Sequence, residues 1–364
     1  MREDVLIAEL MSDVLARHHS RTPGGIAGQG DAVALWHQLE ELGLTLAGVP
    51  DALGGAGATA AAEFAILREA GRNAVSLPLL ETGLLAGWLM AAAGRVAEAG
   101  AMTVAPTGFA DQIIARRGGR GAVLAGRSHH TPFASTVSRV VVCGSTEADE
   151  RIIAVVPRAA IRVTGRTNIA GEPRDLLVFD DVRAEIVHLG VEFRLEQLLR
   201  RAVIGRCAMT AGALAAVRDL TARHVTTREQ FGRPLRKFQA VEHQLAVLAR
   251  ECALADAATE AAVASLVKGR ELSLAEVAAA KVVCGRAAAA VVAIAHQLHG
   301  AIGITREYPL HRYTSLLLAW REDYGSERSW ATALGLELRA APSMWERLAA
   351  TGSLREPGKT ALDG

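Results

Sequence analysis

One segment of the sequence, residues 227–239, combines residue types that bind phosphate and aromatic ligands around a Gly/Pro turn. The guanidinium of Arg228 is a planar donor fork that suits a pyrophosphate. Phe231 offers a ring for stacking, and Gln239 can hydrogen-bond the polar edge of a ligand. These features predict a ligand-binding corner between two helices; a charged helix–helix connection without a ligand is the structural alternative.

A second segment, residues 297–310, follows a long apolar stretch and ends it with glycines. Glycine is typical of a helix C-terminus, and it also lets the backbone approach a ligand closely. We interpret the segment as a second contact region, with a plain Gly-capped loop as the alternative. Its candidate residues are Gln297, Leu298, His299, Gly300 and Gly303.

Long helices must position both segments. Apolar residues recur with a helical period over 195–226, 238–268 and 272–298, and each stretch is longer than the usual three turns. Long facing helices with short connections predict a bundle. We therefore expect a C-terminal α-helical bundle over residues 191–364.

The rest of the chain divides into two further parts. Residues 1–104 carry helical periodicity between Gly-rich loops, including a nearly all-apolar stretch, 79–93, that should be buried on all sides. Residues 105–190 lose this period and show short β-branched runs between turn residues, which predicts a small barrel or sandwich. The expected fold is mainly α, with an N-terminal helical domain, a central β-domain and the bundle.

Composition excludes several functional classes. Lys and Arg number 40 and Asp and Glu 39 among 364 residues, so no basic excess points to nucleic acid. The four cysteines lie far apart without metal-ligand spacing, which favours reduced thiols in a cytoplasmic protein and no metal site. Apolar stretches such as 84–93 are shorter than the roughly 20 residues that span a bilayer. His129 and His130 have no partners at metal spacing, so we expect a surface or loop pair.

Three ordered motifs resemble the acyl-CoA dehydrogenase family. Residues 228–239 resemble its R-x-Q-F-G…F-Q signature, and 297–309 resemble its Q-x-x-G-G-x-G…E-x-P segment, with Ala301 in place of the second Gly. Residues 35–57 resemble its N-terminal E-L-G-L…V-P-E-x-x-G-G-x-G entry. In that family the first two motifs contact an FAD held mainly by the neighbouring subunit. The FAD contacts that the resemblance implies here are Arg228, Gln230, Phe231, Phe238, Gln239, Gln297, Leu298, His299, Gly300 and Gly303.

The resemblance implies an activity and partners. Family members are flavin oxidoreductases acting on CH–CH bonds: a carboxylate removes the α-proton of an acyl-CoA thioester, and the β-hydrogen leaves as hydride to the flavin. It implies FAD as cofactor, an acyl-CoA substrate, an electron-transfer flavoprotein or similar acceptor, and a role in fatty acid or lipid catabolism. The family fold, an α-helical domain, a β-domain and a four-helix bundle, builds dimers or tetramers.

The catalytic base is where the sequence departs from the family. An ungapped alignment from Glu307 puts Tyr324 at the position of the usual Glu, and a Tyr with a reference pKa of about 10 is a poor base. The position on the preceding long helix that serves some members falls near Ala202, which is no carboxylate either. The weak candidates for a displaced base are Glu322, Asp323 and Glu327, which otherwise form a solvated acidic turn beside Arg321 and Arg328.

The central domain departs too. The stretches Thr103–Asp111 and Gly126–Phe133 do not keep the family's T-E-P-x-x-G-S-D and W-I-T-N residues, which hold the flavin ring. The sequence keeps the residues that contact the flavin of a partner subunit, whereas it lacks the residues that would hold a flavin in its own β-domain. We therefore expect a subunit that completes the flavin site of a heteromeric enzyme. The alternatives are a self-sufficient homo-oligomer with a displaced base and a flavin-free scaffold of the same fold.

Overall fold

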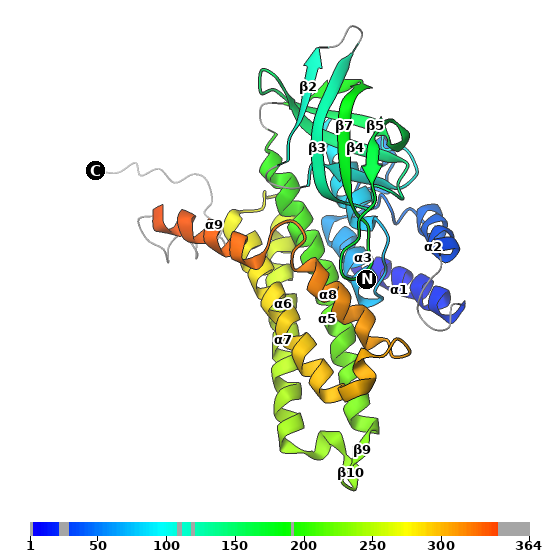
Figure 1. The fold of residues 1–364 in the computed structure, drawn as a ribbon, viewed down its shortest axis with the longest axis vertical. Helices are drawn as coiled ribbons and strands as arrows, with labels where there is room; N and C mark the ends of the chain where they lie inside the picture. The colour runs from blue at the N-terminus through cyan, green and yellow to red at the C-terminus, as the bar shows by residue number, and fades with distance from the viewer. Residues whose placement is uncertain (1–2, 22–28, 108–110, 118–120, 191–192, 341–364) are drawn as a thin grey trace.

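The computed structural model describes residues 3–21, 29–107, 111–117, 121–190 and 193–340. Helices open the chain, a twisted sheet follows, and long helices form an elongated bundle on the other side of the N-terminal helices (Figure 1). The predicted fold class is confirmed. The tail 356–364, for which we expect a polar end, lies outside the described residues.

The N-terminal part of the chain is helical. The structure gives its helices as α1 (Glu3–Arg21), α2 (Gln29–Glu41), the short η1 (Asp51–Leu53), α3 (Ala60–Arg72), the π-helix η2 (Leu80–Gly87) and α4 (Trp88–Ala92). A Cβ at Gly71 would lie 1.9 Å from the carbonyl oxygen of Met209, so glycine lets α3 touch the bundle backbone. The apolar stretch predicted to be buried is buried throughout η2, and it carries Glu81 into the interior.

One sheet of eight strands has the order β6-β7-β3-β2-β4-β5-β8, with β1 beside β4, and side chains from most of its strands share one hydrophobic core. The strands are β1 (Met102–Ala105), β2 (Ile113–Arg117), β3 (Ala122–Pro132), β4 (Arg139–Thr146), β5 (Arg151–Pro157), β6 (Arg162–Thr164), β7 (Arg174–Ala184) and β8 (Ile186–His188). The expected surface or loop pair is on the surface: His129 and His130 are both exposed, but they lie in strand β3 and not in a loop. The register between β3 and β7 shifts between Leu124 and Gly126 and again between Ser128 and Thr131, across the two histidines. Gly, Ser and His in this strand hide the β-branched pattern, and the long partner strand supplies the pairing.

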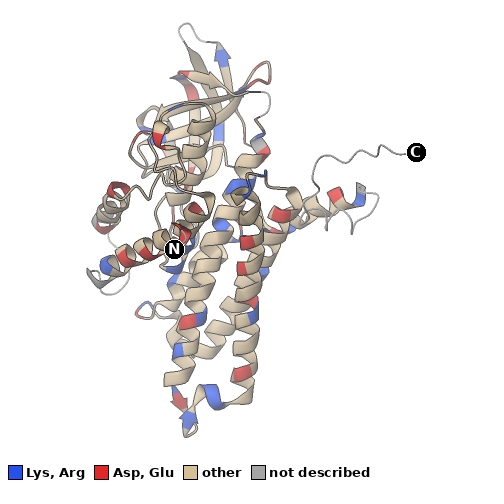
Figure 2. Ribbon diagram, turned by 180° about the vertical axis from the view of Figure 1, so that it is seen from behind, with Lys and Arg blue, Asp and Glu red and all other residues tan. Residues whose placement is uncertain are grey.

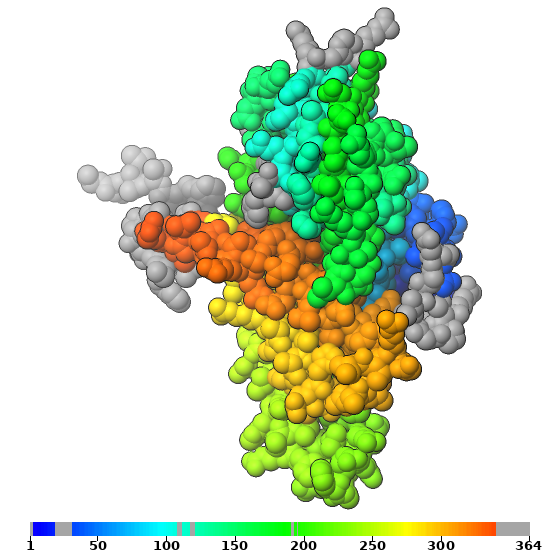
Figure 3. Space-filling view, viewed as in Figure 1, coloured from blue at the N-terminus to red at the C-terminus, as the bar shows by residue number. Residues whose placement is uncertain are grey.

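The bundle begins with α5 (Leu195–Thr227), a helix of 33 residues. It continues through β9 (Glu229–Gln230), β10 (Arg233–Pro234), η4 (Leu235–Lys237), α6 (Gln239–Val267), α7 (Leu274–His299), η5 (Gly300–Ile304), α8 (Leu310–Trp320) and α9 (Glu327–Ala340). A capping box formed by Ser273 and Glu276 starts α7. Helix α9 packs against α7 and projects from the bundle (Figures 1 and 3).

One helix among the described residues, Leu274–Ile304, is long and apolar enough to cross a membrane. The expectation that apolar stretches are too short is therefore wrong for this segment. Helix α7 packs against α5 and α6, and more than half of its most apolar window is buried inside the protein. This is the environment of a bundle-core helix. Charges of both signs are spread along the molecule (Figure 2), whose net charge is +1.

Candidate functional site

The hairpin that follows α5 presents the first candidate motif to solvent. Strands β9 and β10 pair antiparallel, and the two turn residues Phe231 and Gly232 both have positive φ, 53° and 79°. A positive φ is costly for a bulky aromatic residue, and such strain is concentrated at functional sites. Phe231 is nevertheless 90 % exposed, and the positive φ of both turn residues is what a two-residue hairpin between β9 and β10 requires.

The remaining residues of this motif surround the hairpin. Arg228 caps the end of α5, its amide donating to the carbonyl of His224, and its side chain is exposed. Phe238 is half-buried, with the Phe231 ring edge-on to it at 6.1 Å and the Arg233 guanidinium 4.2 Å from its ring centre. Gln230 and Gln239 are exposed on either side.

The second motif lies at the C-terminal end of α7. Gln297 is exposed, whereas the side chains of Leu298 and His299 are buried. Gly300 is exposed with φ 65° and ψ −147°, a conformation that glycine almost alone adopts. No atom lies within 4 Å of a Cβ built on it, so its backbone is open to a ligand. Gly303 is buried, and a Cβ there would press on His299 and Leu310, which makes its role one of packing.

Two histidines join the two motifs. The rings of His224 on α5 and His299 on α7 stack with centroids 4.3 Å apart. His299 donates from Nδ1 to the carbonyl of Ala295, and its Nε2 lies 3.1 Å from the hydroxyl oxygen of Tyr308. Burial lowers the pKa of both imidazoles, and Arg228 adds to the effect at His224. The structure thus brings the hairpin and the end of α7 to the same end of the bundle.

Arg228, Gln297 and the open backbone at Gly300 offer the charged fork, the amide and the close approach that a dinucleotide pyrophosphate requires. The residues present at this end therefore fit part of an FAD. Leu298 and His299 can take part only through their backbone, because their side chains face the interior.

Tyr324, which the ungapped alignment puts at the position of the usual base, lies far from this end. Tyr324 follows α8, is buried, and donates a hydrogen bond of 3.1 Å to Oε1 of Glu81. Arg206 of α5, whose guanidinium lies 5.9 Å from the Tyr324 ring centre, precedes Arg228 by 22 positions, about 33 Å of helix rise. Burial and the neighbouring Glu81 raise the pKa of Tyr324 well above its ordinary value, so it is a neutral donor at physiological pH.

The three candidates for a displaced base lie in different surroundings. Glu322 is exposed. Asp323 is no solvated turn residue: Arg174 holds its carboxylate through contacts of 2.7 and 3.0 Å, and Arg206 lies 3.1 Å away. Burial acts to raise the pKa of Asp323, but the two guanidinium groups outweigh burial and lower it. Glu327 is half-buried and accepts from Nε of Arg321 at 2.6 Å.

The two β-domain stretches that replace the family's flavin-holding residues bind each other. The amide of His129 donates to Asp111 at 2.7 Å, and its ring Nδ1 lies 2.7 Å from the same carboxylate. Thr107 donates to the carbonyl of His129. The polar groups of these two stretches therefore hydrogen-bond each other. Residues 108–110 of the first stretch lie outside the described part of the chain.

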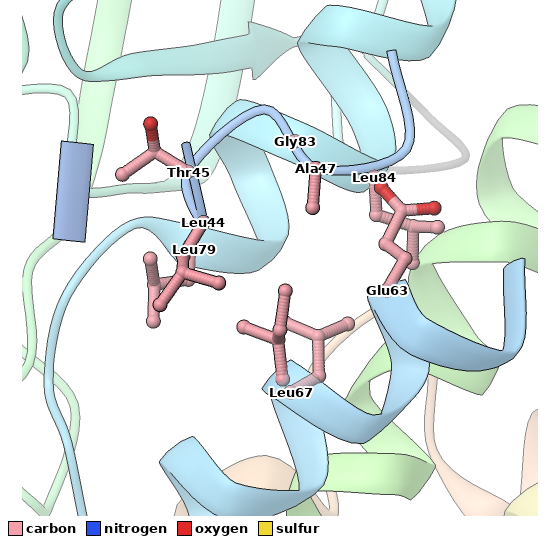
Figure 4. A pocket seen from close by; sticks show the side chains of 9 residues that line it. Leu44, Thr45, Ala47, Glu63, Leu67, Leu79, Gly83 and Leu84 are labelled. Atoms are coloured by element: carbon pink, nitrogen blue, oxygen red, sulfur yellow. The ribbon is translucent and has the colours of Figure 1, made fainter. Parts of the chain in front are cut away.

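Small cavities are found near two charged side chains. One, of about 10 Å³, lies between α3, η2 and the loop before Val49; Figure 4 shows Glu63 with leucines around it. Burial raises the pKa of Glu63 to about 7, against the opposing effect of Arg201. The other, also about 10 Å³, adjoins Arg206. Each holds at most one water molecule. Among the described residues no cluster of three metal-ligand side chains occurs, and the four cysteines are buried free thiols.

Sequence reasoning missed Glu81, Arg174 and Arg206, the buried charges around Tyr324. A signal for the first was present: it is the lone acid in a stretch predicted to be buried on all sides, and a buried carboxylate needs a charged or hydrogen-bonding partner. No comparable signal marks the two arginines, because their partners are remote in sequence.

Comparison with known proteins agrees with the motifs. The family model for the acyl-CoA dehydrogenase N-terminal domain matches residues 5–98, and that for the C-terminal domain matches 182–321. Acyl-CoA dehydrogenase FadE28 of Mycobacterium tuberculosis is 27% identical over 301 residues, covering 78% of this chain and 86% of the relative.

Solved structures share the fold. The ChsE4-ChsE5 complex from Mycobacterium tuberculosis has a TM-score of 0.83 at 20% identity and covers 94% of this chain and 99% of that one. Butyryl-CoA dehydrogenase from Megasphaera elsdenii has a TM-score of 0.83 at 19% identity, with 93% and 99% covered. The two family models together span more than half of the sequence, and this chain belongs to the acyl-CoA dehydrogenase family of oxidoreductases that act on acyl-CoA.

Proposed function

We propose that this chain is a subunit of a heteromeric, FAD-dependent acyl-CoA dehydrogenase, in which it completes the flavin site of a partner subunit. The observation that carries the proposal is the almost fully exposed Phe231, which has a positive φ in the hairpin that follows Arg228. An aromatic ring held in a costly conformation with no intrachain contact over most of its surface fits a role in binding another molecule.

The polar residues at this end have separate roles. Arg228 neutralises pyrophosphate charge, and the exposed amides of Gln230, Gln239 and Gln297 hydrogen-bond the nucleotide portion. Gly300 lets the backbone approach the ligand, and Phe238 supports the Phe231 ring. When bound, FAD supplies the hydride acceptor for α,β-desaturation of the thioester.

Two further observations support a division of labour between unlike subunits. The base position holds Tyr324, which is buried and bonded to Glu81. The β-domain stretches that hold flavin in the family are engaged with each other. The partner therefore supplies the base and the ring-binding loops. One solved structure with the same fold is a complex of two different proteins, ChsE4 and ChsE5.

The remaining assignments follow from membership in the family. We propose that electrons pass from the flavin to an electron-transfer flavoprotein or a similar acceptor. One solved structure with a similar fold is described as the electron transferring flavoprotein of Acidaminococcus fermentans. Four buried free thiols fit a reducing cytoplasm, and the reaction belongs to lipid catabolism. We divide the chain into domains at residues 1–104, 105–190 and 191–364.

Co-expression tests the proposal. The full chain is expressed alone and together with a family member encoded beside it, and flavin absorbance between 350 and 500 nm is recorded after gel filtration. Flavin only in the co-expressed sample is expected. Flavin in the chain alone would support a self-sufficient homo-oligomer, and no flavin in either sample would support a scaffold.

A further inference from the structure

Two buried cysteines meet between long helices of the bundle. Cys207 lies on α5 and Cys284 on α7, and each is exposed by 2 %. The Cys207 thiol hydrogen-bonds the sulfur of Cys284. The two residues are 77 positions apart in the sequence, so the packing of α5 on α7 brings them together. We call Cys207 and Cys284 the thiol pair.

The groups around Cys284 stabilise a thiolate. Oγ1 of Thr259, on α6, lies 3.4 Å from its Sγ, and Lys281 lies one turn earlier on the same face of α7. The hydrogen bond from Cys207 lowers the pKa of Cys284, burial opposes it, and Thr259 and Lys281 lower it further. The same hydrogen bond, together with burial, raises the pKa of Cys207. Cys284 is therefore the nucleophilic sulfur of the thiol pair, and Cys207 holds the proton.

A small cavity gives the thiol pair room for a reactant. The cavity has a volume of about 10 Å³, and its walls include both cysteines, Thr210, Gly285 and Arg321. A cavity of this size holds one water molecule, and hydrogen peroxide is larger than water by a single oxygen atom. Arg321, with 30 % of its side chain exposed, links this wall to solvent. A small polar oxidant therefore has a short route to the two sulfurs.

The other two cysteines lack this environment. Cys143 lies in β4, and Cys252 lies on α6 with its Sγ donating to the carbonyl of Leu214. Burial raises the pKa of each of these thiols to about 12, so both keep their protons at physiological pH. Neither is among the residues that line the cavity. The same chain thus contains two reference thiols for the pair.

We propose that Cys207 and Cys284 are a redox-active thiol pair, which hydrogen peroxide oxidises to a disulfide between α5 and α7. The Cys284 thiolate attacks one oxygen of the peroxide, the O–O bond breaks, and hydroxide leaves and takes up a proton. The Cys207 sulfur then attacks the resulting sulfenic acid, the S–O bond breaks, and water leaves. In total the two thiols lose two electrons and two protons, and the peroxide becomes two molecules of water.

The disulfide would join two helices that carry the candidate ligand contacts at their C-terminal ends. Arg228 follows α5, and Gln297 lies near the end of α7. A covalent bond between the helices restricts the unfolded chain and so stabilises the folded one, and a dithiol reductant reverses it by thiol–disulfide exchange. The inference stands apart from the proposed function, since both sulfurs belong to this chain and no flavin takes part in the reaction.

Peroxide treatment of the full, folded chain tests the inference. The reduced protein is exposed to hydrogen peroxide, the remaining thiols are alkylated in denaturant, and the peptides are analysed by mass spectrometry with and without dithiothreitol. We expect a reducible peptide that links Cys207 to Cys284, while Cys143 and Cys252 are still alkylated. The thiol pair should be lost at least about tenfold faster than the reference thiols, because the thiolate is the form that attacks peroxide.

Two results would overturn the inference. One is oxidation of all four cysteines at the same rate, and the other is four intact thiols without a cross-link while circular dichroism shows a folded protein. The melting temperature gives a second readout: the oxidised wild type should melt above the reduced protein, and dithiothreitol should remove the difference. An oxidised protein that carries the cross-link but melts at or below the reduced form would contradict the stabilising role.

Single variants identify the role of each sulfur. Cys207→Ala should form no disulfide, and its Cys284 sulfenic acid should be trapped by dimedone. A Cys284 that dimedone leaves unlabelled in this folded variant would contradict its assignment as the nucleophile. Cys252→Ala, which removes a reference thiol, is the matched control and should give the same cross-linked peptide as the wild type.

Discussion

The hydroxyl of Tyr324 donates to the carboxylate of Glu81 across 243 positions of sequence, at 3.1 Å, inside the protein. This bond joins the position that an ungapped alignment gives to the family's base to the π-helix of the N-terminal part. It makes Tyr324 a component of the core, with a pKa raised well above the ordinary value by burial and by Glu81.

Removal of this hydroxyl should affect stability more than catalysis. Tyr324→Phe loses one hydrogen bond, worth about 0.5–1.5 kcal/mol, while Glu81 keeps its contact with Arg206. Urea unfolding measures the loss, and steady-state kinetics of the assembled enzyme should be nearly unchanged. A drop in kcat of about a thousandfold would mean that Tyr324 takes part in proton transfer.

Substitution of Arg206 should lower the free energy of unfolding far more than substitution of Tyr324. Arg206→Met leaves Glu81 and Asp323 buried with a missing partner, and the expected loss in the free energy of unfolding is about 3–5 kcal/mol. The double variant with Glu81→Gln should recover part of that loss, because one unpaired charge is gone. Denaturant unfolding of both variants checks this.

The control is Arg72→Met, which removes a partly exposed ion pair with Asp219 and should cost about 1 kcal/mol or less. Equal losses in the free energy of unfolding for Arg72→Met and Arg206→Met would contradict a stabilising role for the buried charges around Arg206.

Arg228 should matter for flavin and not for folding. Arg228→Ala removes an exposed fork that we assign to pyrophosphate, and FAD affinity of the complex should fall about 10- to 100-fold, the effect of one charge-assisted hydrogen bond. Flavin fluorescence after dialysis measures the affinity. Arg250→Ala, an exposed arginine further along α6, is the matched control and should retain its flavin. Equal retention by the two variants would argue against the assignment.

Glu63 should make stability depend on pH. Burial raises its pKa from 4.5 to about 7, so the folded state holds a proton that the unfolded state releases. Its contribution to stability is fully present below pH 4.5 and is lost as the pH rises to about 7. Relative to the wild type, Glu63→Gln should therefore gain melting temperature as the pH rises between these values. The exposed variant Glu260→Gln should follow the wild-type curve, and identical pH dependence of the wild type and Glu63→Gln would disprove the assignment.

The long helices were predictable because their signal is local. The stretch expected over 238–268 is α6, Gln239–Val267, and its repeating apolar positions are sufficient to identify it. Strand β3 was not predictable, since Gly126 and His129 interrupt any strand pattern and the pairing with β7 is set by residues about 50 positions later.

The candidate site divides in the same way. Arg228 and Gln297 stand in motifs that can be read from the chain directly, and the stacking of His224 on His299 places the two motifs at one end. Asp323 was expected in a solvated turn because its own neighbours are polar. Its partners Arg174 and Arg206 lie 149 and 117 positions away, and only the fold brings them together.

The most direct measurement is the number of FAD molecules per chain after gel filtration, taken on the chain alone and on the co-expressed complex. We expect a colourless chain, one FAD per pair of unlike chains in the complex, and loss of that FAD in the Arg228→Ala complex. One FAD retained by each copy of the chain purified alone would contradict it.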